Sequence, residues 1–252
     1  MNFVSDVFLL FGRHMKKALR RPIWLLMGLL QPVLYLILYM PLLKNMGAGS
    51  MLPTGEIVRV FVPGMLVIMA MSSLFAGFSF IDEIRTGIIA RWLVTPTSRV
   101  GIIFSLIANQ KVTLFCQACI LLVIARFLGL HVPVWGLFFT LLLVLMIGVT
   151  MASLSYSISL SVRDEGVLAS ITNTFYLPVM LLSGIMLPIS FAPHWIKVAA
   201  HFNPFYYAVE ASRSLFAGEF GNRIVAEGFV VIVIFMTVAL WLAVRSLNKM
   251  SA

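Results

Sequence analysis

The chain of 252 residues is 61% hydrophobic and only 11% charged, and its mean hydropathy is +1.04. Because a water-soluble globular domain has about 45–50% apolar and about 25% charged residues, this composition excludes that class and indicates an integral membrane protein. The formal net charge of +9 is expected for basic segments that face anionic lipid, and no nucleic-acid partner is expected.

A helix that crosses a bilayer core about 30 Å thick needs about 20 largely apolar residues. The sequence predicts six such transmembrane helices, at residues 22–43, 60–81, 105–128, 134–161, 166–188 and 228–245. The third has the shortest uncharged run, between Lys111 and Arg126, so these two cations are expected to extend to the membrane interfaces. Lys111 is interpreted as an anchor at the end of that helix, with contact to a transported substrate as the alternative.

Residues 1–21 precede the first predicted span and show helical amphipathicity. Phe3, Val7 and Phe11 fall on one face, and several cations fall on the other. This pattern predicts a helix in the membrane interface, with a merely basic flank as the alternative. By the positive-inside rule the cations put the N-terminus in the cytoplasm, and six spans return the C-terminus to that side.

The connection between spans two and three, IDEIRTGIIARWLVTPTSRV, is unusually charged for this chain. Apolar residues recur in it at helical spacing: Ile81, Ile84, Ile88 and Trp92. Arg91 lies where a helix dipole favours a cation, and Pro96 is a helix terminator. The pattern predicts a short helix over 82–95, parallel to the membrane on the cytoplasmic side. A solvated interfacial loop is the alternative.

The sequence contains no phosphate-binding G-x-x-x-x-G-K-[ST] motif, no nucleophile motif and no cluster of metal ligands. We therefore expect no enzyme activity in this chain and no cofactor or metal bound by it. None of the nine acidic residues lies in a predicted span, whereas ion-driven carriers usually keep a carboxylate near the midplane. Cys116 and Cys119 are interpreted as small packing residues.

Two stretches resemble the permease subunits of ABC type-2 exporters, particularly the daunorubicin and nodulation exporter branch. They are FVPGMLVIMAMSSLFAGFSFIDEIRTGIIARWLVTPTSR and GIMLPISFAPHWIKVAAHFNPFYYAVEASRSLF. The resemblance covers nearly the whole chain, as one transmembrane domain, 1–252. It implies an all-α membrane protein that pairs with a second copy of itself, or with a close relative, and with two separate ATP-binding subunits, which would carry ATP and Mg²⁺. It also implies a bacterial cytoplasmic (inner) membrane location, with both termini cytoplasmic.

The resemblance makes the charged segment 82–95 a coupling helix that contacts an ATP-binding subunit. The turn after the fourth span would supply a smaller second contact. The residues implied in ATPase coupling are Asp82, Glu83, Arg85, Gly87, Arg91, Pro96, Arg163, Asp164 and Glu165.

In the family, spans one, two and five face the dimer axis. The translocation pathway is therefore expected to be lined by Tyr35, Tyr39, Phe75, Phe78, Phe175, Tyr176 and Met180. Aromatic and methionine walls suit a hydrophobic or amphipathic drug or lipid-like substrate. For each of these residues, helix packing or lipid contact is the alternative.

The family also folds short external helices back toward the membrane, here within 190–220, and these are expected to form an outer gate. The candidate gate residues are Pro188, Trp195, Asn203, Pro204, Tyr207, Glu210 and Arg213. Glu210 and Arg213 lie one helical turn apart and are expected to form a structural ion pair, whereas the aromatic residues are equally compatible with interfacial anchoring. Two other functions fit the sequence: an ABC exporter of polysaccharide or lipid-linked glycan, and an ATP-independent channel or carrier.

Overall fold

The computed structural model describes residues 12, 15, 28–38, 54–87, 99–185, 189 and 192–249, and these residues form helices, turns and loops without a β-strand. Within them, five helical segments are long and apolar enough to cross a membrane. They are Val58–Arg85, Ile103–Phe127, Val134–Val162, Glu165–Leu182 and Arg223–Leu247. They correspond in order to predicted spans two to six.

The first predicted span, 22–43, contains a shorter apolar helix, Gly28–Leu38, and its flanks lie outside the described residues. The interfacial helix predicted over 1–21 also lies outside them, apart from two single residues. The structure therefore supports a multi-pass helical membrane protein, while the count of six spans stays a prediction.

The second span consists of three consecutive elements: α3 (Thr54–Met71), the 3-10 helix η1 (Ser72–Phe75) and α4 (Ala76–Arg85). Helix α4 ends where Gly87 adopts a left-handed φ of 71°, a conformation that glycine adopts without steric cost. Residues 82–85, which the sequence assigns to the coupling helix, are therefore the last residues of α4. Residues 88–98 lie outside the described part of the chain.

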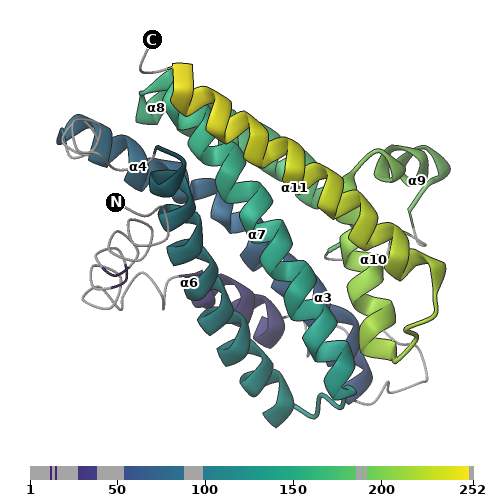
Figure 1. Ribbon diagram of the computed structural model, residues 1–252. Coiled ribbons are helices and arrows are strands. Elements are labelled where there is room, and N and C mark those ends of the chain that lie inside the picture. The colour runs from purple at the N-terminus through teal and green to yellow at the C-terminus, as the bar shows by residue number, and fades with distance from the viewer. Residues whose placement is uncertain are drawn as a thin grey trace.

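Helix α7 (Val134–Val162) runs through the middle of the view in Figure 1 and packs against most of the other long helices. It contacts α6 (Arg99–Phe127), α11 (Arg223–Lys249), and both α3 and α4. Gly148 permits one of these close approaches, because a Cβ there would overlap with the side chain of Leu114 in α6. Small residues at helix interfaces let backbones approach closely, which is typical of membrane helices.

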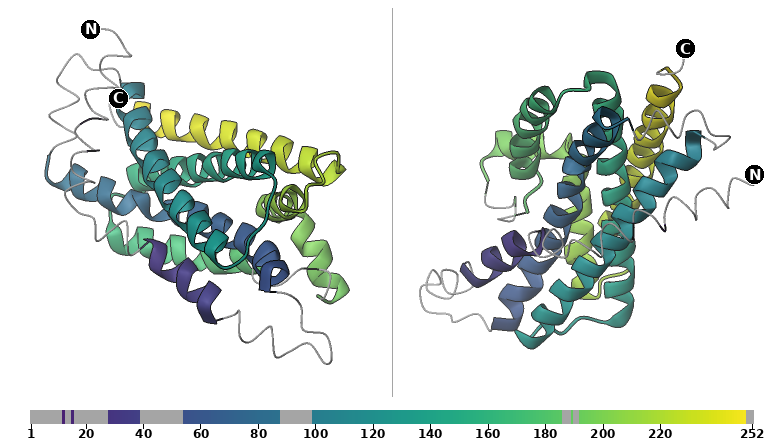
Figure 2. Two further views of the ribbon diagram at one scale, coloured as in Figure 1. Left: turned by 90° about the horizontal axis from the view of Figure 1, so that it is seen from below. Right: turned by 90° about the vertical axis from the view of Figure 1, so that its left-hand side faces the viewer.

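Helix α8 (Glu165–Leu182) lies on the opposite side of the second span from α7 (Figure 2). Only 17% of its apolar 18-residue segment is buried inside the protein, compared with 78% for the corresponding segment of the second span. The second span is therefore the interior helix of the bundle, and α8 is peripheral. Beyond α8, two shorter helices, α9 (His194–His201) and α10 (Pro204–Ala217), connect to α11.

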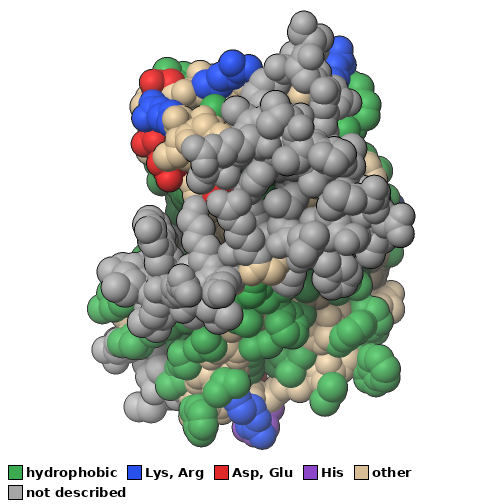
Figure 3. Space-filling model, turned by 60° about the vertical axis from the view of Figure 1, so that its left-hand side comes forward, with side chains coloured by type: hydrophobic (Ala, Val, Ile, Leu, Met, Phe, Trp, Pro, Cys, Tyr) green, Lys and Arg blue, Asp and Glu red, His purple; other side chains and the backbone are tan. Residues whose placement is uncertain are grey.

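The two ends of the bundle differ in composition. The end of α4, the turn between α7 and α8 and the end of α11 lie together at the upper end in Figure 1, whereas α10 and the connection between α6 and α7 lie at the lower end. Figure 3 shows acidic and basic side chains gathered at the upper end of one face and a largely apolar surface below. This separation is expected when the helices cross a bilayer.

Candidate coupling site and external helices

An arginine at the end of the second span contacts the turn that precedes α8. Arg85 Nη1 lies 3.3 Å from Glu165 Oε1, and Arg85 Nη2 lies 3.6 Å from Asp164 Oδ2. The three side chains are each about half exposed, at 52%, 45% and 54% in the order Arg85, Glu165 and Asp164. We call these three residues the charged cluster. It brings together two predicted contact groups that lie 80 residues apart in the sequence.

The local backbone fixes the acidic half of the charged cluster. Arg163 has a left-handed φ of 56°, which turns the chain sharply out of α7. Asp164 is the N-cap of α8, because its Oδ1 accepts a hydrogen bond of 3.0 Å from the backbone N–H of Val167. Both carboxylates therefore lie at the positive end of the α8 dipole, where a negative charge is favoured.

The predicted contact residues on α4 face different environments. Asp82 and Arg85 are exposed, whereas the side chain of Glu83 is only 5% exposed. Glu83 is therefore not part of the exposed surface on which the charged cluster lies. Arg91 and Pro96 lie outside the described residues.

A serine of α7 bridges the irregular part of the second span. The Oγ of Ser155 accepts a hydrogen bond of 2.8 Å from the N–H of Gly77 and donates one to the carbonyl of Leu74. A Cβ at Gly77 would overlap with the hydroxyls of both Ser155 and Ser159, so this contact requires glycine. Short 3-10 stretches within a long helix often mark hinges. Sequence reasoning missed this site, although the SSLFAG stretch and the serines spaced four apart in α7 are its visible signal.

The predicted pathway residues separate into three environments. The ring of Phe75 in η1 lies 5.4 Å from that of Tyr176 in α8 and 6.2 Å from that of Phe78 in α4, as centroid distances. Phe175 is 65% exposed on α8, whereas Met180 is buried in the core. Tyr35, on the helix Gly28–Leu38, is partly buried against the core, and Tyr39 lies outside the described residues. Aromatic rings of the second and fifth predicted spans thus meet directly.

Asn203 connects α10 to the end of α8. Its Oδ1 accepts a hydrogen bond of 3.0 Å from the N–H of Phe205, which makes it the N-cap of α10, and Pro204 follows at the first helical position. Its Nδ2 donates a hydrogen bond of 2.7 Å to the carbonyl of Val179. Because Asn203 is only 7% exposed, both bonds are shielded from water.

Arg213 makes a second, larger connection between α10 and its neighbours. Its Nη1 lies 2.6 Å from Glu210 Oε1, so the ion pair expected from the sequence is present. Its Nη2 donates to the carbonyl of Gly184 at 2.8 Å, and its Nε donates to that of Val60 at 3.4 Å. The side chain is only 12% exposed. One guanidinium therefore joins α10 to α3 and to the segment after α8.

The remaining candidate gate residues have separate surroundings. The hydroxyl of Tyr207 donates a hydrogen bond of 3.2 Å to the carbonyl of His201, at the end of α9. Trp195 is 69% exposed on α9, as suits an aromatic residue at a membrane interface. Pro188 lies outside the described residues.

Five membrane-capable helices, a charged cluster at one end and short helices held by buried polar side chains at the other define a multi-pass membrane protein. Residues 5–217 match the ABC-2 type transporter family, and the chain belongs to that family. It is an ABC transport permease, the membrane-spanning part of a transporter. The family thus confirms the resemblance seen in the two sequence stretches.

Curated relatives agree with this assignment. The chain is 30% identical over 220 residues to the "Putative transport permease ycf38" of Cyanophora paradoxa, which covers 85% of this chain and 75% of that protein. The protein of the same name from Porphyra purpurea is 27% identical over 220 residues, which again cover 85% of this chain and 75% of that protein. The "ABC transporter G family member 20" of Dictyostelium discoideum is 23% identical over 205 residues, 78% of this chain and 28% of that longer protein.

Proposed function

We propose that this chain is the permease subunit of an ATP-driven ABC exporter, in which two copies form the pathway and two separate ATP-binding subunits bind ATP and Mg²⁺. The substrate class is a hydrophobic or amphipathic molecule, drug-like or lipid-like. The protein resides in a bacterial cytoplasmic membrane with both termini in the cytoplasm. Membership of the ABC-2 type transporter family supports the permease role.

The observation that carries the coupling part of the proposal is the contact of Arg85 with Asp164 and Glu165. It joins the ends of two spans at an exposed, charged end of the bundle. An ATP-binding subunit that docks there would displace α4 and α8 together. Packed helices transmit rigid-body displacements, whereas an isolated flexible loop would absorb them.

The irregular second span supports a route for that displacement. Because η1 interrupts the helix, α4 can reorient relative to α3 without breaking a continuous α-helical ladder. Ser155 holds the resting geometry by satisfying the backbone groups of Gly77 and Leu74. In this mechanism the α4 segment is the moving arm and α3 is anchored in the core.

Exposed apolar side chains support a particular contact surface for the second permease copy. Helix α8 exposes Phe175, Leu177 and Leu181 at 65%, 56% and 59%. The helix Gly28–Leu38 exposes Ile37 and Leu38 at 57% and 63%. Both helices lie on the side of the second span away from α7, as the left-hand view of Figure 2 shows. The rings of Phe75 and Tyr176 would then lie close to the pathway between the copies.

The external end supports a gate that moves as one piece with the spans. Asn203 and Arg213 attach α10 to the end of α8 and to α3. A displacement of the fifth span at the charged end would therefore reach the external helices through these two side chains. The proposed gate opens by movement of this attached unit.

Reconstitution tests the proposal. The chain is purified with its copurifying ATP-binding subunit and compared with the chain alone in proteoliposomes that contain a fluorescent amphipathic cation. We expect dye movement only with the ATP-binding subunit and hydrolysable ATP, and none with a non-hydrolysable analogue. Nucleotide-independent flux through the chain alone would instead establish a channel or carrier.

A further inference from the structure

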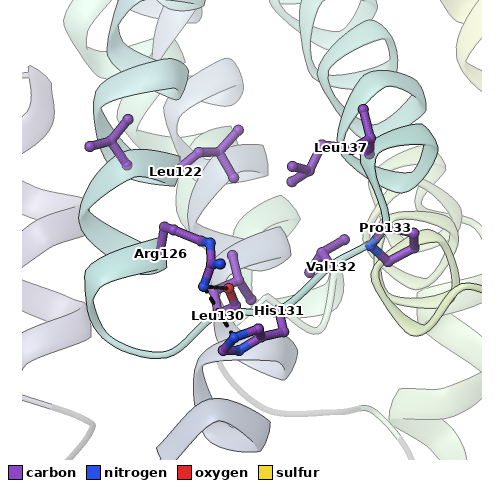
Figure 4. Close-up of a pocket in the computed structure, with 9 residues that line it drawn as sticks. Leu122, Arg126, Leu130, His131, Val132, Pro133 and Leu137 are labelled. Atoms are coloured by element: carbon purple, nitrogen blue, oxygen red, sulfur yellow. Dashed lines mark hydrogen bonds between the residues drawn. The ribbon is translucent and has the colours of Figure 1, made fainter.

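A cavity of about 670 Å³ lies between the last turns of α6, the connection that follows and the first turns of α7 (Figure 4). Its walls are mainly apolar and include Leu122, Val132 and Leu137, whose side chains approach the open space from three sides. Two basic side chains, Arg126 and His131, also line the cavity. The volume is in the range typical of small-molecule and lipid sites, about 300–1,000 Å³.

The partners of Arg126 carry no negative charge. Its Nη1 lies 3.2 Å from His131 Nε2 and donates a weak hydrogen bond of 3.4 Å to the carbonyl of Leu130. His131 Nδ1 donates to the carbonyl of Gly129 at 2.9 Å, which leaves Nε2 as an acceptor for the guanidinium. Among the described residues, no carboxylate lies within ion-pair distance of Arg126. A guanidinium has five N–H donors, so several still point to the surroundings.

The surroundings of the cavity are those of a bilayer. It lies at the ends of two membrane-capable helices, which expose Val123, Phe127, Val134 and Phe138 by more than half beside it. An apolar cavity with a cation at one edge therefore opens onto a surface that lipid would cover. Arginine matches a phosphate with paired hydrogen bonds, and basic pockets between membrane helices on the cytoplasmic side bind anionic headgroups through the same chemistry.

We propose that this cavity binds one anionic phospholipid, with the phosphate on Arg126 beside His131 and an acyl chain against Leu122, Val132 and Leu137. The bound lipid supplies a negative charge that no carboxylate of the described residues supplies to Arg126. The site also adjoins the external helices, because Pro133, in its lining, lies next to Gly218 at the end of α10. A lipid bound in this cavity would therefore lie next to the end of α10, which belongs to the proposed gate.

Native mass spectrometry of the purified chain tests the headgroup. Phosphatidylglycerol, phosphatidylcholine and diacylglycerol with identical acyl chains are added in turn, and inorganic phosphate is the fourth probe. We expect the wild type to retain phosphatidylglycerol in preference to the other probes. In Arg126→Gln the retention of phosphatidylglycerol should fall about fivefold, as expected for the loss of one cation near a lipid headgroup. Arg126→Lys should still retain this lipid. Arg223→Gln is the matched control, because Arg223 is 91% exposed at the same end and pairs with Glu227. Its retention should equal that of the wild type.

A second pair of variants tests the acyl chain. Leu137→Trp fills the cavity and should reduce phosphatidylglycerol retention severalfold, whereas Leu142→Trp places the same bulk on an exposed part of α7 outside it. Equal phosphatidylglycerol retention by wild type and Arg126→Gln, or by the two tryptophan variants, would overturn the proposal. Competition by millimolar inorganic phosphate without a lipid requirement would overturn it in favour of a free phosphate site. Circular dichroism confirms that each variant is folded, and the tryptophan pair decides the proposal if Arg126→Gln does not fold.

Discussion

The hydroxyl of Ser155 in α7 is joined to the backbone of Gly77 in α4 by a hydrogen bond of 2.8 Å, and the same hydroxyl donates to the carbonyl of Leu74. One side chain thereby satisfies two main-chain groups at the point where the second span changes from a 3-10 to an α-helix. Both groups are buried, so neither has water as an alternative partner.

Replacing Ser155 by alanine should destabilise the protein by about 1–3 kcal/mol, because it leaves a buried donor and a buried acceptor without this hydroxyl. The measurement is thermal unfolding in detergent. Ser161→Ala is the control, since Ser161 lies on the same helix, is exposed and bonds only to its own helix at the carbonyl of Ser157. Equal melting temperatures for the two variants would show that the bridge does not hold the second span.

Reversing the charge of Arg85 to glutamate should lower ATP-dependent transport strongly while changing stability by less than about 1 kcal/mol, because exposed ion pairs contribute little to folding. The measurement is dye transport together with unfolding of the same preparation. In a second step, Arg85→Glu is combined with Glu165→Arg, which restores the pairing in the opposite sense. We expect partial recovery of transport from the double variant. If the double variant transports no better than Arg85→Glu, the contact of Arg85 with Glu165 does not matter for transport. Arg85 would then act only by contacting the ATP-binding subunit.

Removing the guanidinium of Arg213 should destabilise the protein more than removing any exposed cation would. Arg213→Met keeps a long, unbranched side chain but leaves Glu210 and the carbonyls of Gly184 and Val60 without their donor. The free energy of unfolding should therefore fall by about 2–3 kcal/mol. Arg213→Lys retains the charge but cannot reproduce the forked contacts, and should lie between wild type and Arg213→Met. The readout is protease susceptibility near α10 together with the melting temperature. Unchanged susceptibility in Arg213→Met would contradict a joining role.

Replacing Asn203 by alanine should cost about 1–2 kcal/mol, because α10 loses its N-cap and the carbonyl of Val179 loses a donor. Asn222→Ala is the comparison, since Asn222 also accepts from a backbone N–H two residues ahead but is exposed. We expect a clearly smaller change in melting temperature for Asn222→Ala. Equal shifts would mean that the connection to α8 adds nothing beyond capping.

Hydropathy by itself identified most of the spans, because a bilayer crossing requires a long apolar run wherever it lies in the fold. The segments 134–161 and 228–245 fall inside α7 and α11, which extend beyond them by one to several residues. Asn203 and Pro204 were assigned from the sequence only to a candidate gate, and their role as the N-cap and first residue of α10 came from the structure. At residue 81 the sequence was less informative. A charged residue after an apolar run marks a membrane boundary but does not reveal that the same helix continues to Arg85.

The sequence determined that this is a helical membrane protein of the ABC transport permease type, because composition, apolar run length and two local motifs are properties of consecutive residues. Only the tertiary structure decided that Arg85 contacts Asp164, that Ser155 bridges the second span and that Arg126 lies at an apolar cavity. The burial of Glu83 beside the exposed Asp82 was decided in the same way. These relationships depend on how helices pack against one another, and residues distant in the sequence carry no local signal of that packing.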